Sequence, residues 1–112
     1  MRPWQVWWMD MGVPIGHEQG GVRPVVVVGS DFHCRLPIGV VLIASMTTRN
    51  RGLPHHVPVF SPDSGLRQTS YVLTEQVEAM SVERFTESQP IGELVESERS
   101  AVRFWLKKMV AA

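Results

Sequence analysis

One glycine-rich stretch, GHEQGGVRPVVVV between residues 16 and 28, holds the residues best suited to binding a charged ligand. Its glycines let the backbone come close to a ligand, because glycine carries no Cβ. Arg23 stands where this loop enters an apolar run, and a guanidinium can donate two parallel hydrogen bonds to phosphate oxygens. The stretch therefore favours recognition of a phosphate group. The simpler alternative is a hairpin in which Arg23 pairs with a nearby acid such as Glu18.

Histidine side chains offer proton transfer and metal binding, since imidazole changes charge near neutral pH. His17 lies in the glycine-rich loop and is the candidate for proton transfer. His55 and His56 are adjacent and lead into an apolar run, and consecutive side chains of a strand point to opposite faces. We therefore expect that these two histidines do not share a metal ion. His33 with Cys34 falls short of the ligand count of a structural zinc site, so the sequence predicts neither a metal nor another cofactor.

Other catalytic arrangements do not fit the sequence. Ser70 lies in no nucleophile-elbow motif, and Cys34 has no histidine and acid arranged around it. No glycine-rich loop ends in Gly-Lys-Ser or Gly-Lys-Thr, which argues against nucleotide hydrolysis. What remains is chemistry in which the substrate brings its own nucleophile, as RNA does with its ribose 2′-hydroxyl.

The elements that must position Arg23 and His17 are short strands. Apolar runs of strand length alternate with turn-rich stretches, and they cover residues 5–9, 24–28, 38–46, 57–60 and 71–77. This pattern predicts a small, strongly curved antiparallel sheet or barrel.

The end of the chain changes to a helical period, with apolar residues three and four positions apart. We expect an amphipathic helix that covers one face of the sheet, a partner-binding helix being the alternative. Its apolar side consists of Ile91, Leu94, Val95, Val102, Trp105, Leu106 and Met109. A shorter helical turn is expected near residues 81–85, with Ser81 as its cap.

Length and composition indicate one globular domain, which we expect to span residues 1–112. Eleven basic residues balance eleven acidic ones, so the net charge does not point to nucleic acid. Cys34 is the only cysteine, which is compatible with a reducing compartment. Neither a signal peptide nor a membrane-spanning apolar run is evident, so we expect a cytoplasmic protein without a membrane partner.

The first apolar run and its flanks are rich in large side chains, namely Trp4, Trp7, Trp8, Met9 and Met11. We expect more apolar surface there than one thin barrel wall can bury, and such surplus surface commonly marks an interface. The pattern therefore predicts a homodimer. Core packing is the competing explanation.

The order of these motifs resembles the MazF/PemK toxin family along nearly the whole chain. VWWMDMG is similar to the family's first strand, GHEQGGVRPVVVV to its hallmark loop and second strand, and VVLIASMTTR to its third strand. LPHHV, SYVLTEQVEAMSVERF and the final helix follow in family order. The resemblance implies a mainly β fold with α (α+β), an SH3-like antiparallel β-barrel with a C-terminal amphipathic helix. It also implies a homodimer that cleaves single-stranded RNA at a short sequence, without metal, and is held inactive by a cognate antitoxin.

The resemblance assigns roles by motif position. Arg23 and Thr47 match the family's catalytic arginine and threonine, and His17 matches a position where some relatives carry a histidine with an acid or base role. The implied RNA-binding surface includes Glu18, Gln19, Gly20, Thr48, Ser70 and Gln76.

Two departures from the family pattern are present. Leu73 and Glu75 stand where some relatives carry an arginine and an aspartate, and Pro3 with Trp4 replaces an Arg-Gly-like start. Two other functions stay open: a toxin of the same fold that poisons DNA gyrase, as CcdB does, and a catalytically inactive binding module. The EQGGVRP segment argues against the gyrase poison, and the intact catalytic arginine and threonine argue against the inactive module.

Overall fold

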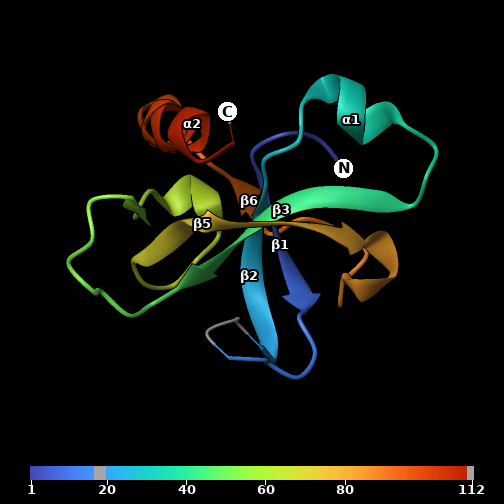
Figure 1. Ribbon diagram of the computed structural model, residues 1–112, viewed down its shortest axis with the longest axis horizontal. Coiled ribbons are helices and arrows are strands. Elements are labelled where there is room, and N and C mark those ends of the chain that lie inside the picture. The colour runs from blue at the N-terminus through green and yellow to red at the C-terminus, as the bar shows by residue number, and fades with distance from the viewer. Residues whose placement is uncertain (17–19, 111–112) are drawn as a thin grey trace.

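The computed structural model describes residues 1–16 and 20–110, and this part of the chain forms an antiparallel sheet with a helix at its C-terminal end (Figure 1). The strands are β1 (Gln5–Asp10), β2 (Val22–Val27), β3 (Val40–Thr47), β4 (His56–Val59), β5 (Ser70–Ser81) and β6 (Gly92–Glu93). The helices are α1 (Asp31–Arg35) and α2 (Glu96–Val110), and single 3-10 turns form η1 (Pro62–Ser64) and η2 (Val82–Arg84).

These strands make one curled sheet in the order β4-β5-β3-β2-β1-β6. Figure 1 shows the hairpin of β1 and β2 projecting away from α1 and α2. Beyond the paired strands, Met11 N donates to Gly21 O and Gly21 N donates to Gly12 O, both at 2.8 Å. Gly12 and Gly21 have φ values of +75° and +72°, which suit glycine because a Cβ would crowd the backbone there. The glycines of this region therefore close the base of the hairpin loop.

Apolar side chains pack on both faces of the sheet, since neighbouring residues of a strand point to opposite sides. The face covered by α2 holds one cluster, which includes Val6, Val26, Ala44, Met46, Val72, Leu94 and Val102. The opposite face holds a second cluster, which includes Trp7, Met9, Met11, Val25, Val27, Val41 and Ile43. Phe85 covers this second cluster and stacks on Trp7 with ring centroids 4.3 Å apart.

The large side chains of the first strand belong to this core. Trp7, Met9 and Met11 are buried, and Trp4 and Trp8 are half-buried. Core packing, the competing explanation, accounts for Trp7, Met9 and Met11, whereas Trp4 and Trp8 stay partly exposed. β1 lies between β2 and β6 in the sheet, so both of its edges are paired.

The C-terminal helix begins later than its apolar period predicts. α2 starts at Glu96, so Ile91, Leu94 and Val95 precede it. Ile91 N donates to Val6 O at 2.8 Å and Leu94 N donates to Trp4 O at 3.0 Å. The backbones of Ile91 and Leu94 therefore extend the sheet beside β1 and cannot also form helix. Apolar spacing does not distinguish these two uses of the same residues.

The predicted turn after β5 is confirmed. η2 covers Val82–Arg84, and the Ser81 hydroxyl accepts a hydrogen bond from Glu83 N at 3.2 Å. β5 itself runs to Ser81 and is longer than its apolar run. α1 lies in a stretch that the sequence pattern left without an element.

β5 carries an irregularity opposite the end of β3. Ala44 pairs with Val77 and Met46 pairs with Val72, so residues 73–76 lie opposite the single residue Ser45. Extra residues in one strand bend it and redirect their side chains. Glu75 and Gln76 lie within this irregularity.

The predicted mainly β fold with a C-terminal helix is confirmed, with the strands forming a curled half-barrel. Among residues 1–16 and 20–110, no helix has the length and apolar character needed to cross a membrane.

Candidate active site

Arg23 lies at the start of β2, where the hairpin loop enters the sheet. It pairs with Met9 of β1, and its side chain is half-buried. The Nε of Arg23 donates to the Gly20 carbonyl oxygen at 2.8 Å. This bond ties the guanidinium to its own loop. Within residues 1–16 and 20–110, the terminal nitrogens of Arg23 have no hydrogen-bond partner, and they can donate to a ligand.

Thr47 is the last residue of β3, two residues beyond the end of the pairing between β2 and β3. β2 and β3 pair Val25 with Ser45 and Val27 with Ile43, and the same register continued by two residues brings Arg23 opposite Thr47. Val25, Val27 and Ile43 belong to the second cluster. By strand alternation, Arg23 is on the same face as Val25 and Val27, and Thr47 is on the same face as Ile43. The two side chains therefore leave the same face of the sheet at matching positions.

The Thr47 side chain has a local backbone partner. Thr47 is 7% exposed, and its hydroxyl oxygen accepts a hydrogen bond from Arg49 N at 3.2 Å. The hydroxyl proton is still free to be donated, since a hydroxyl both donates and accepts. A guanidinium and a hydroxyl on one face make a donor set suited to an anionic group.

Thr48 and Ser70 lie together, but in a groove on the other face of the sheet. The groove has a volume of about 510 Å³ and is lined by Trp8, Pro24, Thr48, Gly65, Leu66, Arg67, Gln68 and Ser70. Pro24 and Thr48 directly follow Arg23 and Thr47 in the chain, so this groove begins one residue beyond the candidate catalytic pair. Arg67 and Gln68 were missed from the sequence, where only their position after a turn at Gly65 could have drawn attention to them.

The remaining predicted site residues are spread differently. His17, Glu18 and Gln19 lie outside the described residues. The carbonyl oxygen of Gly20 accepts the hydrogen bond from the Arg23 Nε. Gln76 is half-buried within the β5 irregularity, and the structure does not group it with Thr48 or Ser70.

His55 and His56 converge on Glu75. The His56 Nε2 lies 2.9 Å from Glu75 Oε2 and 3.1 Å from Oε1, and the His55 Nε2 lies 3.6 Å from the same Oε2. The expectation that these rings point apart is wrong, because β4 begins only at His56 and His55 does not follow strand alternation. Partial burial alone would raise the pKa of the Glu75 carboxyl, but the hydrogen bond from His56 and the histidine charges outweigh it and lower the pKa.

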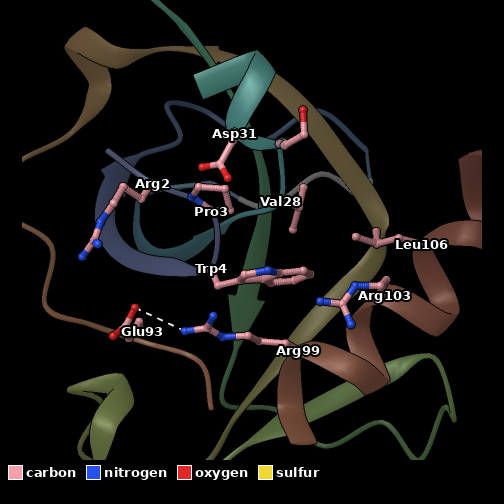
Figure 2. Close-up of a pocket in the computed structure, with 11 residues that line it drawn as sticks. Arg2, Pro3, Trp4, Val28, Asp31, Glu93, Arg99, Arg103 and Leu106 are labelled. Carbon is pink, nitrogen blue, oxygen red and sulfur yellow. Dashed lines mark hydrogen bonds and ion pairs between the residues drawn. The ribbon is translucent and has the colours of Figure 1, made fainter. Parts of the chain in front are cut away.

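A second hollow lies between the N-terminal segment and α2, with a volume of about 570 Å³ (Figure 2). Trp4 lies in it with a φ of +70°, and the Arg103 guanidinium sits 5.3 Å from its ring centre. Arg99 is paired with Glu93 at 3.3 Å. This hollow contains none of the predicted site residues.

Residues 2–110 match the family model described as "PemK-like, MazF-like toxin of type II toxin-antitoxin system", and the chain belongs to that family. It is 32% identical to Endoribonuclease EndoA of Bacillus subtilis over 83 residues, which are 73% of this chain and 72% of that protein. It is 33% identical to Endoribonuclease MazF of Staphylococcus saprophyticus over 89 residues, which are 78% of this chain and 73% of that protein.

Solved structures agree with the fold. MazF from Deinococcus radiodurans superposes with a TM-score of 0.83 at 20% identity, covering 100% of this chain and 97% of that one. An endoribonuclease in complex with its cognate antitoxin from a mycobacterial species gives a TM-score of 0.79 at 21% identity, covering 98% of this chain and 94% of that one.

Proposed function

We propose that this toxin is a metal-independent endoribonuclease that cleaves single-stranded RNA at a short sequence, with Arg23 and Thr47 as its catalytic donors. The observation that supports the proposal is the register of β2 against β3, which, continued by two residues, sets Arg23 opposite Thr47 on one face of the sheet. Membership of the toxin family and relatives named endoribonucleases support the enzyme class.

The proposed reaction uses the nucleophile of the substrate. The ribose 2′-oxygen attacks the adjacent phosphorus, the bond from phosphorus to the 5′-oxygen breaks, and the products are a 2′,3′-cyclic phosphate and a 5′-hydroxyl. Negative charge grows on the phosphoryl oxygens in the transition state, where the Arg23 guanidinium and the Thr47 hydroxyl donate hydrogen bonds to them. The protein supplies donors at fixed positions, so the step needs no metal ion.

Proton transfer requires a separate group, because a guanidinium almost never loses its proton. His17 is our candidate to accept the 2′-hydroxyl proton or to protonate the leaving 5′-oxygen, since imidazole does both near neutral pH. Glu18, Gln19 and Gly20 share its loop and are assigned to RNA contact.

We assign RNA binding also to the groove that holds Thr48 and Ser70, together with Gln76. Sequence-specific RNA recognition uses unstacked bases held by stacking and by hydrogen bonds to their edges. The groove offers the Trp8 ring, two hydroxyls, and the Gln68 amide for such contacts.

The proposal includes partners. As a type II toxin, the protein acts with a cognate antitoxin, and solved structures of similar fold include a toxin bound to its antitoxin. We further propose that the single domain of residues 1–112 works as a homodimer in the cytoplasm, where its RNA substrate and its antitoxin are made.

The test is incubation of the purified protein with a long RNA in excess EDTA. We expect discrete fragments that end in 2′,3′-cyclic phosphate and 5′-hydroxyl groups. Thr47→Val keeps the β-branched shape that suits a strand but removes the hydroxyl, and we expect single-turnover cleavage to fall on the order of a hundredfold. Thr47→Ser is the matched control, which retains the donor and most of the activity.

Two results would refute the proposal. Cleavage that stops with EDTA in protein that keeps its circular dichroism spectrum, and returns with an added divalent ion, would contradict the metal-independent mechanism. An RNA left intact by wild-type protein, with inhibition of gyrase supercoiling in a parallel assay, would favour the gyrase-poisoning alternative instead.

A further inference from the structure

A cluster of three metal-ligating side chains lies outside the proposed cleavage site. His55, His56 and Glu75 each offer one ligand atom, and these atoms all lie within 4.8 Å of one another. Among residues 1–16 and 20–110, this is the one group of three or more such residues that could hold a metal ion. The cleavage chemistry proposed for Arg23 and Thr47 makes no use of it.

Three elements hold the cluster in place. His56 pairs with Leu73 between β4 and β5, and the Thr74 hydroxyl donates to the His55 carbonyl oxygen at 2.7 Å. The His55 ring lies 6.2 Å from the Trp105 ring of α2 in an edge orientation. Glu75 reaches both histidines because it lies in the irregularity of β5. The ligand atoms therefore converge by the packing of β4, β5 and α2.

An ordinary hydrogen bond explains the position of His56 beside Glu75 but not that of His55. The His56 Nε2 at 2.9 Å from Glu75 Oε2 is a good hydrogen bond. The His55 Nε2 at 3.6 Å is too far from that oxygen for one, yet its ring nitrogen points to the same carboxylate. Ligand atoms at about 2.1 Å around a tetrahedral zinc lie about 3.4 Å apart. The two separations from the carboxylate oxygen fall on either side of this value.

The exposure of the three side chains suits an ion that enters from solvent. The His56 side chain is 2% exposed and forms the floor of the cluster, whereas those of His55 and Glu75 are 25% and 35% exposed. Two imidazoles and one carboxylate with an open fourth position form a known zinc ligand set.

We propose that His55, His56 and Glu75 form a binding site for a divalent transition-metal ion of the zinc type, separate from the RNA-cleaving residues. Two imidazole nitrogens and a carboxylate oxygen select such ions over magnesium or calcium, which prefer oxygen ligands. The bound ion joins the start of β4 to the irregular part of β5. Binding therefore stabilises the folded chain, because the unfolded chain does not preform the site.

The test uses Co²⁺ as an optical probe on the full chain after treatment with EDTA and removal of the chelator. We expect one Co²⁺ per chain, visible absorption bands that disappear when Zn²⁺ displaces it, and a melting temperature that rises with added Zn²⁺. His55→Gln and Glu75→Gln should each weaken binding about a hundredfold or more, since losing a group that only hydrogen-bonds to a ligand already costs about 10- to 100-fold.

His33→Gln and His17→Gln are the matched controls, because each removes one histidine from outside the cluster. We expect both to bind Co²⁺ as the wild type does. His55 and Glu75 are partly exposed, so their variants should keep the wild-type circular dichroism spectrum. Absence of Co²⁺ bands in the wild type, or equal binding by folded His55→Gln and Glu75→Gln proteins, would overturn the proposal. No RNA is used, so neither result bears on the cleavage mechanism.

Discussion

The guanidinium of Arg23 is tethered to the loop that precedes it. Its Nε donates to the Gly20 carbonyl oxygen at 2.8 Å, which restrains the guanidinium. A lysine at this position would keep the positive charge but would lose both the tether and the planar pair of donors. The lysine substitution therefore distinguishes two roles of Arg23, attraction of RNA and stabilisation of the transition state.

The Arg23→Lys variant should fold and bind RNA but cleave slowly. We expect the single-turnover rate at saturating protein to fall on the order of a hundredfold, as for loss of a well-placed transition-state donor. Binding to an uncleavable 2′-deoxy substrate should change little. Arg35→Lys, at the exposed end of α1, is the control. A folded Arg23→Lys protein that cleaves at nearly the wild-type rate would exclude the catalytic role.

Cys34 should be a slow nucleophile in the native protein. Burial raises the pKa of its thiol, the amino terminus opposes this in part, and Asp31 adds to it, so little thiolate is present at neutral pH. Alkylation by iodoacetamide, followed by mass spectrometry, should be slower at pH 7 for native protein than for protein in urea. It should accelerate as the pH rises. Equal rates for native and unfolded protein at pH 7 would contradict this.

At the scale of elements, Glu98 joins α2 to the segment after β4. Glu98 is only 3% exposed, and its Oε2 accepts hydrogen bonds from Phe60 N at 2.9 Å and Ser61 N at 3.1 Å. Its Oε1 accepts from Val95 N at 3.2 Å, as a glutamate in the first turn of a helix does when it reaches back to the cap residue. One carboxylate thus satisfies three backbone donors from two segments far apart in the chain.

Glu98→Ala should destabilise the fold by about 3 kcal/mol, because it leaves partly buried N–H groups without acceptors. Glu98→Gln keeps one acceptor oxygen and should lose less. Glu96→Ala is the matched control, since Glu96 is exposed on the same helix turn and such substitutions change stability by about 0.5 kcal/mol or less. Urea unfolding at one fixed protein concentration measures all three. Equal stability of Glu98→Ala and Glu96→Ala would contradict this role.

At the scale of the whole molecule, exposed apolar side chains occur in the β1–β2 hairpin, at Val13, Ile15 and Val22, and on α2. Phe104 is 54% exposed and Val110 is 69% exposed on α2, whereas Trp7 and Met9 are inside. Exposed apolar side chains gathered on one element commonly mark a protein interface. The outer side of α2 is therefore the better candidate for contact between two copies than the segment that the sequence suggested.

We expect light scattering at micromolar concentration to give twice the chain mass of 12.6 kDa. Phe104→Glu should shift the protein toward the monomer, because it places a charge in an apolar contact. Phe32→Glu changes a phenylalanine on α1 that is even more exposed, at 75%, and should leave the dimer intact. A wild-type mass of one chain would contradict dimerisation, and a dimeric Phe104→Glu protein would exclude α2 as the interface.

The sequence by itself determined the features that depend on neighbours in the chain. Apolar runs predicted β1 to β5 to within a few residues at most ends, because side-chain alternation and turn residues are local signals. Ser81 was recognised as a cap for the same reason. The ordered motifs around Arg23 and Thr47 were sufficient to indicate the toxin family and its fold.

Tertiary structure alone decided what depends on pairing between distant segments. The register of β2 against β3, continued by two residues, sets Arg23 opposite Thr47, and Thr48 lines the groove with Trp8 and Pro24. The irregularity in β5 exists only relative to β3 and brings Glu75 to His55 and His56, against the expectation from adjacency. Register and bulges follow from which partner strand is beside them, and residue spacing within one strand does not contain that information.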